Sequence, residues 1–264
     1  MSETPMSLIQ HLEELRKIII RIIIAIVIGT IVSFALFEQT LMEIINAPVY
    51  REGIYLHQLG MTEVFITQIK VSFLSGLVIT IPFTAYQVWS FILPALYAHE
   101  RKYVYMIVPA TILLFAAGVV FGYYVVLPIA ITFLTTRLPE VVELLSFAQY
   151  VSFVVSLLIP FGFVFQLPLA IAFLARIGVV NYKFFQEKRK YAILIIFIVS
   201  ALLTPPDPLS LILMAIPVMI LYEFSILIAW LIGKKVKKEE VDEAEDFEEV
   251  TETKEEGEDK DDIS

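Results

Sequence analysis

The feature that most constrains this chain is the length of its uninterrupted apolar blocks, such as residues 18–37 and 107–127. Because an α-helix rises about 1.5 Å per residue, roughly 20 such residues cross a hydrocarbon core about 30 Å thick. Several blocks of this kind exceed what one soluble core buries, and apolar residues make up 58% of the chain, with a mean hydropathy of +0.81. We therefore predict an all-α, polytopic integral membrane protein.

The apolar blocks predict six transmembrane helices, preceded by an amphipathic interfacial helix over residues 7–17. The first block is too long for the core of a signal peptide, so we interpret it as a retained span. The fifth block has only 14 residues and ends at the proline-rich run TPPDP, which forces a non-helical turn. The six predicted spans are residues 18–37, 64–93, 103–126, 150–174, 191–204 and 209–232.

Charge divides the chain into three parts. Residues 1–17 form the predicted cytoplasmic amphipathic helix, and residues 18–233 form the transmembrane domain. Residues 234–264 begin basic and then turn strongly acidic, with 15 acidic residues and two lysines among residues 239–264. Such a segment has too few apolar residues to offset the entropy of ordering. We predict a disordered cytoplasmic tail.

Basic residues set the predicted orientation. With the N-terminus inside, fourteen Lys and Arg residues fall on the inner side of the membrane, while only Arg51 and Arg137 fall outside. Inner loops of membrane proteins carry such an excess. Trp89 and Trp230 also fall near the inner interface, where aromatic belts occur. We predict a multi-pass protein of the cytoplasmic membrane with both termini in the cytoplasm.

No catalytic motif or metal-ligand spacing appears in the sequence, and the chain has no cysteine. The histidines are scattered in or near loops, so we expect no enzyme, no metal site and no cofactor. The informative polar residues at the inner interface are Glu14 and Glu100. Each alone is typical of a solvated charge paired with Arg16 or Arg101. Together, two carboxylates at headgroup level suit a basic peptide, because guanidinium pairs with carboxylate through two hydrogen bonds.

Three polar side chains lie within the apolar blocks, where polar groups usually face protein or a water-filled cavity. Lys70 lies about two turns into the second span, so its amine could snorkel outward. Gln166 lies near the middle of the fourth span, where a helix–helix hydrogen bond is the simplest reading. Glu223 is expected to be paired or near the inner interface. A small-solute site formed by these three residues is the alternative.

Three separated segments resemble those of the twin-arginine translocase core subunit family, TatC. They are HLEELR at residues 11–16, FILPALYAHER at residues 91–101 and LLTPPDPLS at residues 202–210. The resemblance covers residues 7–235. It implies a protein that receives folded cargo by binding signal peptides with two consecutive arginines. It also implies small single-span partners, TatA and TatB, and export driven by the proton-motive force.

The resemblance also implies roles for particular residues of this chain. Glu14 and Glu100 would contact the arginine pair, and their matched segments would shape the signal-peptide site through Arg16, Phe91, Leu96 and Arg101. The family usually has glutamate at the position of Gln166, so this chain keeps a hydrogen-bonding group there without a titrating one. The predicted function is a signal-peptide receptor and translocase scaffold. Two alternatives are a secondary transporter of a small polar solute and a membrane-embedded hydrolase.

Overall fold

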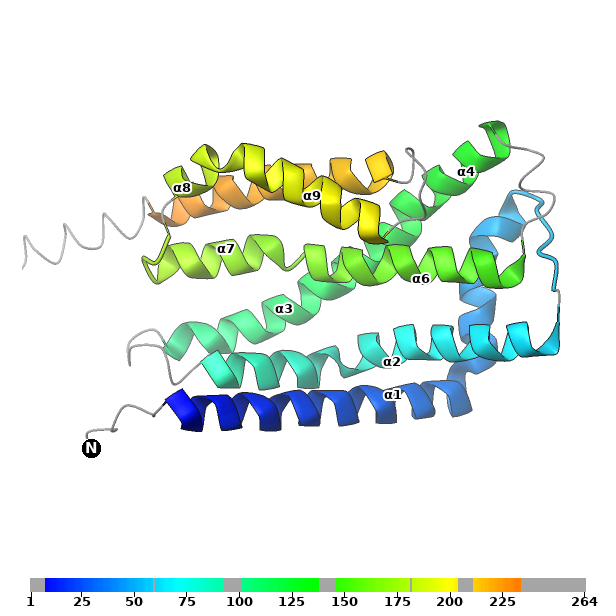
Figure 1. The fold of residues 1–264 in the computed structure, drawn as a ribbon, viewed down its shortest axis with the longest axis horizontal. Coiled ribbons are helices and arrows are strands. Elements are labelled where there is room, and N and C mark those ends of the chain that lie inside the picture. The colour runs from blue at the N-terminus through cyan, green and yellow to red at the C-terminus, as the bar shows by residue number, and fades with distance from the viewer. Residues whose placement is uncertain are drawn as a thin grey trace, which may run out of the picture.

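The computed structural model of this chain describes residues 8–58, 60–92, 101–137, 146–180, 182–203 and 211–233, which form a bundle of helices (Figure 1). The predicted tail, residues 234–264, lies outside the described residues. In chain order the labelled elements are α1 (Leu8–Arg51), α2 (Met61–Ile92), α3 (Arg101–Phe121), η2 (Gly122–Val126), α4 (Leu127–Arg137), α6 (Phe147–Val164), α7 (Leu167–Arg176), α8 (Tyr182–Glu187) and α9 (Arg189–Leu203). An unlabelled last helix spans Leu211–Gly233 and is orange in Figure 1.

The first helix is longer than the sequence predicted. The amphipathic segment, the first apolar block and the residues after Phe37 form one helix that ends at Arg51. Figure 1 shows the last part of α1 turning sharply and passing behind α2 and α6. Polar residues after Phe37 led the sequence analysis to end the first span there. Helical hydrogen bonding nevertheless continues through these residues, because neighbouring helices pack against them.

Two tyrosine hydroxyls hold the last part of α1 at its proline. Pro48 has no N–H, so the carbonyl of Ile44, four residues earlier, lacks its helical donor. Tyr123 donates its hydroxyl hydrogen to that carbonyl at 2.5 Å, and buried Tyr150 donates to the neighbouring carbonyl of Ile45 at 2.7 Å. Tyrosines from η2 and α6 therefore fix the far end of α1 against the bundle.

Close backbone approach joins α1 to α2. A Cβ added to Gly76 would lie 2.5 Å from the backbone nitrogen of Thr30, and one added to Gly29 would lie 2.7 Å from Cγ2 of Thr80. Two glycines thus let the helices approach closely, as is common between membrane helices. Near the start of α2, Gln68 donates from its amide to the carboxylate of Glu38.

Proline residues shape the middle helices. The π-helical turn η2 ends two residues before Pro128. The Leu127 N–H bonds to the carbonyl of Gly122, five residues earlier, instead of the carbonyl four residues earlier that an α-helix would use. Between α6 and α7 the chain makes a turn at Phe165 and Gln166, and Pro168 falls in the first turn of α7. Because Pro168 has no N–H, a continuous helix would leave the carbonyl of Val164 without its donor.

The described residues contain five helices long and apolar enough to cross a membrane, namely Ile9–Arg51, Met61–Ile92, Met106–Phe133, Phe147–Arg176 and Leu211–Gly233. The fifth predicted span is α9, whose 15 residues extend about 22 Å. It lies beside the last helix (Figure 1). The all-α, multi-span fold predicted from the sequence is confirmed, with α9 at the position of the short fifth span.

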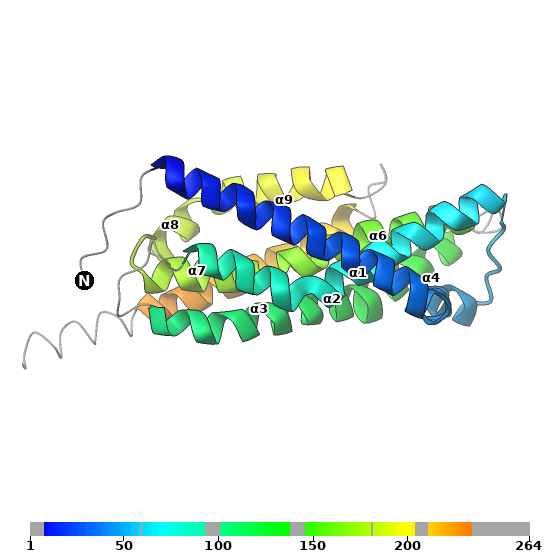
Figure 2. The ribbon, with the colours of Figure 1, turned by 90° about the horizontal axis from the view of Figure 1, so that it is seen from below.

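Both ends of the described chain lie at the same end of the bundle (Figures 1 and 2). We call this the basic end: it comprises the start of α1, the end of α2, the end of α7, α8, the start of α9 and the end of the last helix. The main core lies toward the opposite end, where α2, α4 and α6 bury Val71, Leu127, Val151 and Val154.

Candidate functional site

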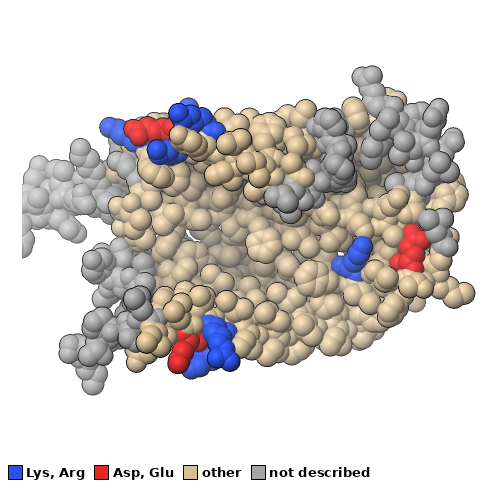
Figure 3. Space-filling view, in the orientation of Figure 1, with Lys and Arg blue, Asp and Glu red and all other residues tan. Residues whose placement is uncertain are grey.

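Charged side chains gather at the basic end. Figure 3 shows mixed blue and red patches there, over the start of α1 and over α8 and α9. The exposed cations on these elements and at the turn between α8 and α9 are Arg16, Lys17, Arg21, Lys183, Lys188, Arg189 and Lys190. The apolar surface between the two ends carries few charges in this view (Figure 3). The bundle therefore has a polar end and an apolar belt, as a membrane-spanning protein requires.

A polar hollow lies along one face of α1 at the basic end. Its volume is about 490 Å³, and it is lined by Gln10, Glu13, Glu14, Lys17, Ile18 and Arg21. These positions recur at spacings of three and four residues, so they share a face over about three helical turns. Glu14 is half-buried, while Glu13 beside it is exposed. The hollow brings carboxylates and cations together at the membrane interface.

An aromatic stack joins the start of α1 to the end of α2. The rings of His11 and Phe91 lie 4.3 Å apart between centroids, with planes inclined by 17°. His11 and Glu14 lie three residues apart, on neighbouring turns of one helix. Phe91 is the second-last residue of α2. The two segments that carry the predicted site thus meet in the fold.

The remaining predicted site residues are placed only in part. Arg16 is exposed on α1, and it does not line the hollow. Leu96 and Glu100 lie outside the described residues, between α2 and α3. Arg101 begins α3, and its side chain also lies outside the description. The partnership of Glu14 with Glu100 therefore stays a prediction.

The three polar residues of the apolar blocks lie apart. Lys70 is exposed and donates to the hydroxyl of Ser152 at 2.8 Å, joining α2 to α6. Gln166 donates to the carbonyl of Thr111 at 3.0 Å. Because Ser152 and Gln166 are 14 residues apart along one span, about 20 Å separates their levels. These residues do not form the single solute site that the transporter alternative required, and that alternative has no support.

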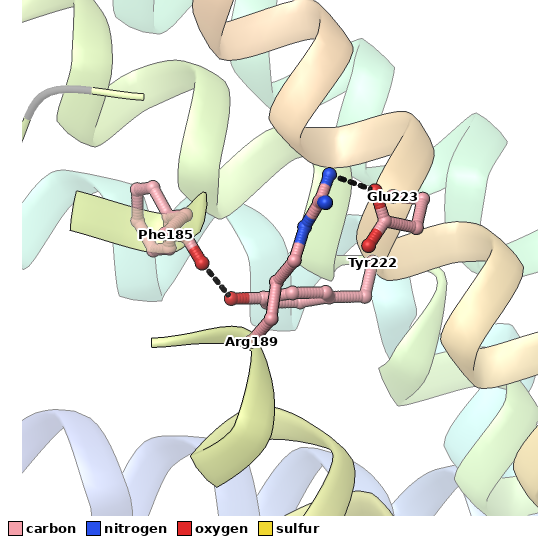
Figure 4. Close-up of polar contacts among 4 residues, drawn as sticks. All are labelled: Phe185, Arg189, Tyr222 and Glu223. Carbon is pink, nitrogen blue, oxygen red and sulfur yellow. Dashed lines mark hydrogen bonds and ion pairs between the residues drawn. The ribbon is translucent and has the colours of Figure 1, made fainter. Parts of the chain in front are cut away.

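Glu223 forms an ion pair with Arg189 at the basic end. Its carboxylate lies 2.6 Å from the guanidinium of Arg189, and both side chains are about half exposed (Figure 4). Tyr222, one residue earlier, donates its hydroxyl hydrogen to the carbonyl of Phe185 at 2.8 Å. These two contacts attach the last helix to α8 and α9. Glu223 is thus placed as an interface residue that holds helices together.

Sequence reasoning missed a hydrogen-bonded group around Thr111. The indole N–H of Trp89 donates to the Thr111 hydroxyl at 2.9 Å, and Phe173 packs edge-on against the indole with centroids 4.9 Å apart. Trp89 is buried, whereas Trp230 is exposed. A buried tryptophan needs a partner for its N–H. The only hint in the sequence was a threonine in the next apolar block.

The fold and this site define a polytopic α-helical membrane protein with a polar, acid-bearing hollow at one end. Among the described residues, no group of three or more His, Asp or Glu side chains could hold a metal ion. The comparisons with known proteins are specific. The model of the family described as Sec-independent protein translocase protein (TatC) matches residues 10–217. The chain therefore belongs to the TatC family, whose members are protein translocase components.

Relatives match this chain over most of its length. The Sec-independent protein translocase protein TatC of Carboxydothermus hydrogenoformans is 40% identical over 237 residues, covering 89% of this chain and 97% of that protein. The TatC of Escherichia coli strain K12 is 36% identical, covering 90% and 94%. A crystal structure of the twin arginine translocase receptor TatC superposes with a TM-score of 0.78 at 37% identity, covering 84% and 99%.

The family match encloses part of the predicted site. Residues 10–217 include Glu14, Glu100 and Gln166, whereas Glu223 and the acidic tail lie beyond them. The contact of Glu223 with Arg189 therefore lies partly outside the matched region. The start of α1 and the end of α2, which the stack of His11 on Phe91 joins, lie inside the matched region.

Proposed function

We propose that this chain is the signal-peptide receptor and core scaffold of a twin-arginine translocase. It lies in the cytoplasmic membrane with both termini in the cytoplasm, and it supports export of folded proteins driven by the proton-motive force. Its partners are TatA and TatB, the small single-span subunits, and its ligands are signal peptides with two consecutive arginines. Family membership and the arrangement of the basic end support this proposal.

One observation carries the proposal. Half-buried Glu14 lines a polar hollow on α1, and His11 on the same helix stacks on Phe91 of α2. Glu100 follows Phe91 by nine residues in the sequence and lies outside the described residues, so its partnership with Glu14 is part of this proposal. An extended peptide entering at the headgroup level would meet both acids. The matched solved relative is itself described as a twin arginine translocase receptor.

Partial dehydration makes the acid pair selective. A fully exposed ion pair contributes roughly 0–1 kcal/mol, which is too little for selection. A hydrogen bond to a charged group at a partly dehydrated interface contributes about 1.5–3 kcal/mol. Two such contacts discriminate by about a hundredfold, at roughly 1.4 kcal/mol for each tenfold change. The planar guanidinium makes two parallel bonds to a carboxylate and lysine cannot, so twin arginine binds more tightly than twin lysine at equal charge.

Peptide affinity tests the proposal. The full chain in nanodiscs is titrated with a twin-arginine peptide and with a twin-lysine peptide at two salt concentrations. Glu14→Gln and Glu100→Gln should each weaken twin-arginine binding by about tenfold, and twin-lysine binding by much less. The matched control is Glu187→Gln, which removes an exposed acid on α8 at the same end. Twin-arginine affinity within twofold of wild type in both variants would defeat the acid-pair site.

Partner binding is tested separately. The full chain should copurify with single-span subunits coexpressed in the same membrane, and the Glu14→Gln variant should copurify equally well. This outcome would separate the scaffold from the receptor, because the acid pair contacts the peptide and not the subunits. Failure of the unmodified chain to retain either subunit would contradict the scaffold role.

A further inference from the structure

An apolar groove runs along the outer surface between α1 and α2. Its volume is about 530 Å³, and apart from Arg21 at one end its walls are almost wholly apolar. Ala25, Gly29 and Thr80 line it where the two helices approach closely. Ile28 and Ile79 also line it and are 55% and 50% exposed. The groove is thus open to the surrounding membrane along its length, has an apolar lining, and ends at Arg21 on the side of the basic end.

The groove matches the depth of one membrane leaflet. Its α1 lining runs from Arg21 to Val32 through positions three or four residues apart. At about 1.5 Å per residue, Val32 lies about 16 Å along the helix axis from Arg21. That is about half of a hydrocarbon core roughly 30 Å thick. A chain lying in the groove with its head at Arg21 would therefore end near the middle of the bilayer.

Arg21 lies where a headgroup would be. It begins the groove and also lines the polar hollow, so it lies at the boundary between apolar and polar surface. Within the part of the chain that the structure describes, no carboxylate lies within ion-pair distance of its guanidinium. Lys17, one turn earlier, is exposed on the same face. Glu14 lies about 10 Å further along the helix, roughly one Debye length away.

We propose that this groove binds one acyl chain of an anionic phospholipid, whose phosphate is held by Arg21. Guanidinium binds phosphate oxygens through two parallel hydrogen bonds, and the apolar groove accepts the acyl chain. A zwitterionic lipid offers the same chain but carries a compensating cation beside its phosphate. The site therefore selects the headgroup by charge and lies beside the signal-peptide hollow without sharing its acids.

Native mass spectrometry of the full chain in detergent tests the selection. The first phosphatidylglycerol bound should dissociate about fivefold less readily than the first phosphatidylcholine with the same acyl chains, the effect of about one cation near the surface. Arg21→Gln should bring that preference below twofold, while Arg21→Lys should keep part of it. Ile28→Trp fills the groove and should weaken binding of both lipids.

Matched variants control for general effects. Lys183→Gln removes an exposed cation at the same end, and Ile198→Trp adds an indole to an exposed face of α9. Both should leave the lipid preference unchanged. A preference that persists in Arg21→Gln would overturn the proposal, and so would an equal loss in Lys183→Gln. No signal peptide is used, so the result is independent of the proposed receptor function.

Crosslinking locates the lipid. A phosphatidylglycerol with a photoreactive group in its acyl chain should label the α2 peptide that contains Ile79 and Phe83 in preference to α9. Even labelling of both helices would overturn the proposal. The chain has no cysteine, so Ile28→Cys supplies one thiol in the groove. Efficient disulfide-linked pairs in the membrane would show that a second copy covers the groove, and would also overturn it.

Discussion

The amide of Gln166 donates to the backbone carbonyl of Thr111 at 3.0 Å, and this contact attaches the α6–α7 turn to α3. The Thr111 hydroxyl in turn accepts the indole N–H of Trp89. Three segments distant in sequence thus meet at one threonine inside the apolar part of the bundle. Because Gln166 acts here as a donor, an amide suits the position as a carboxylate cannot.

Replacing Gln166 should separate hydrogen bonding from charge. Gln166→Met keeps the side-chain length and should lower stability by about 0.6 kcal/mol, the mean for such bonds between membrane helices. Gln166→Glu should lower it further at neutral pH, because a carboxylate cannot donate to the Thr111 carbonyl. Thermal unfolding in detergent measures both, with exposed Gln149→Met as control. A Gln166→Glu variant as stable as wild type would contradict the donor role.

The tyrosine contacts at Pro48 predict a second effect. Tyr150→Phe removes the buried hydroxyl that donates to the Ile45 carbonyl, which also lies four residues before the Val49 N–H in α1. The expected loss is about 0.5–1.5 kcal/mol, the net contribution of one hydrogen bond. Resistance to unfolding by a denaturing detergent measures it. The control is Tyr124→Phe, because Tyr124 is exposed and only packs against the Tyr123 ring. Equal behaviour of the two variants would show that the hydroxyl contributes nothing.

The close approach of α1 and α2 predicts whether replacing a glycine between them raises or lowers the stability of the protein. Gly76→Ala gains about 1 kcal/mol of helix propensity. The added Cβ would nevertheless lie 2.5 Å from the backbone of Thr30, and such overpacking costs typically about 1–3 kcal/mol. We expect net destabilisation, measured by differential scanning calorimetry. Gly233→Ala, where nothing lies within 4 Å, should not destabilise. A more stable Gly76→Ala protein would show that α1 moves aside freely.

The contacts of the last helix predict a small electrostatic effect. Arg189 and Glu223 are 48% and 52% exposed, so Glu223→Gln should cost at most about 1 kcal/mol, and less at high salt. Tyr222→Phe should cost about 1 kcal/mol independently of salt, because its partner is the uncharged Phe185 carbonyl. Limited proteolysis between α7 and α9, followed over ionic strength, distinguishes the two. A salt-dependent Tyr222→Phe effect would contradict this assignment.

The orientation of the chain is open to direct test. The basic residues predict that a reporter fused after Ser264 is cytoplasmic, while one inserted near Pro139 is external. The common end of the first and last described helices requires an even number of crossings. A topology reporter active only on one side of the membrane measures this. An external C-terminus would contradict both the predicted orientation and the assignment of short α9 as a span.

The fold class followed from the sequence because a bilayer demands helices of a fixed length. Long apolar blocks therefore predicted the spans. The sequence did not predict the turn before Pro168, which divides the predicted fourth span into α6 and α7. The sequence did not predict that α1 would continue to Arg51, since polar residues after the first block resemble a loop. Tyr123 and Tyr150, from distant helices, support that continuation.

By itself the sequence determined the membrane class, the short α9 and the segments that form the basic end. Only the tertiary structure decided which face of each helix points inward. In a bilayer both the lipid-facing and the protein-facing surfaces are apolar, so hydrophobic periodicity does not distinguish them. For this reason the sequence placed Trp89 near the inner interface without showing that its ring lies buried against Thr111. The meeting of His11 with Phe91 likewise depends on helix packing, which no local pattern encodes.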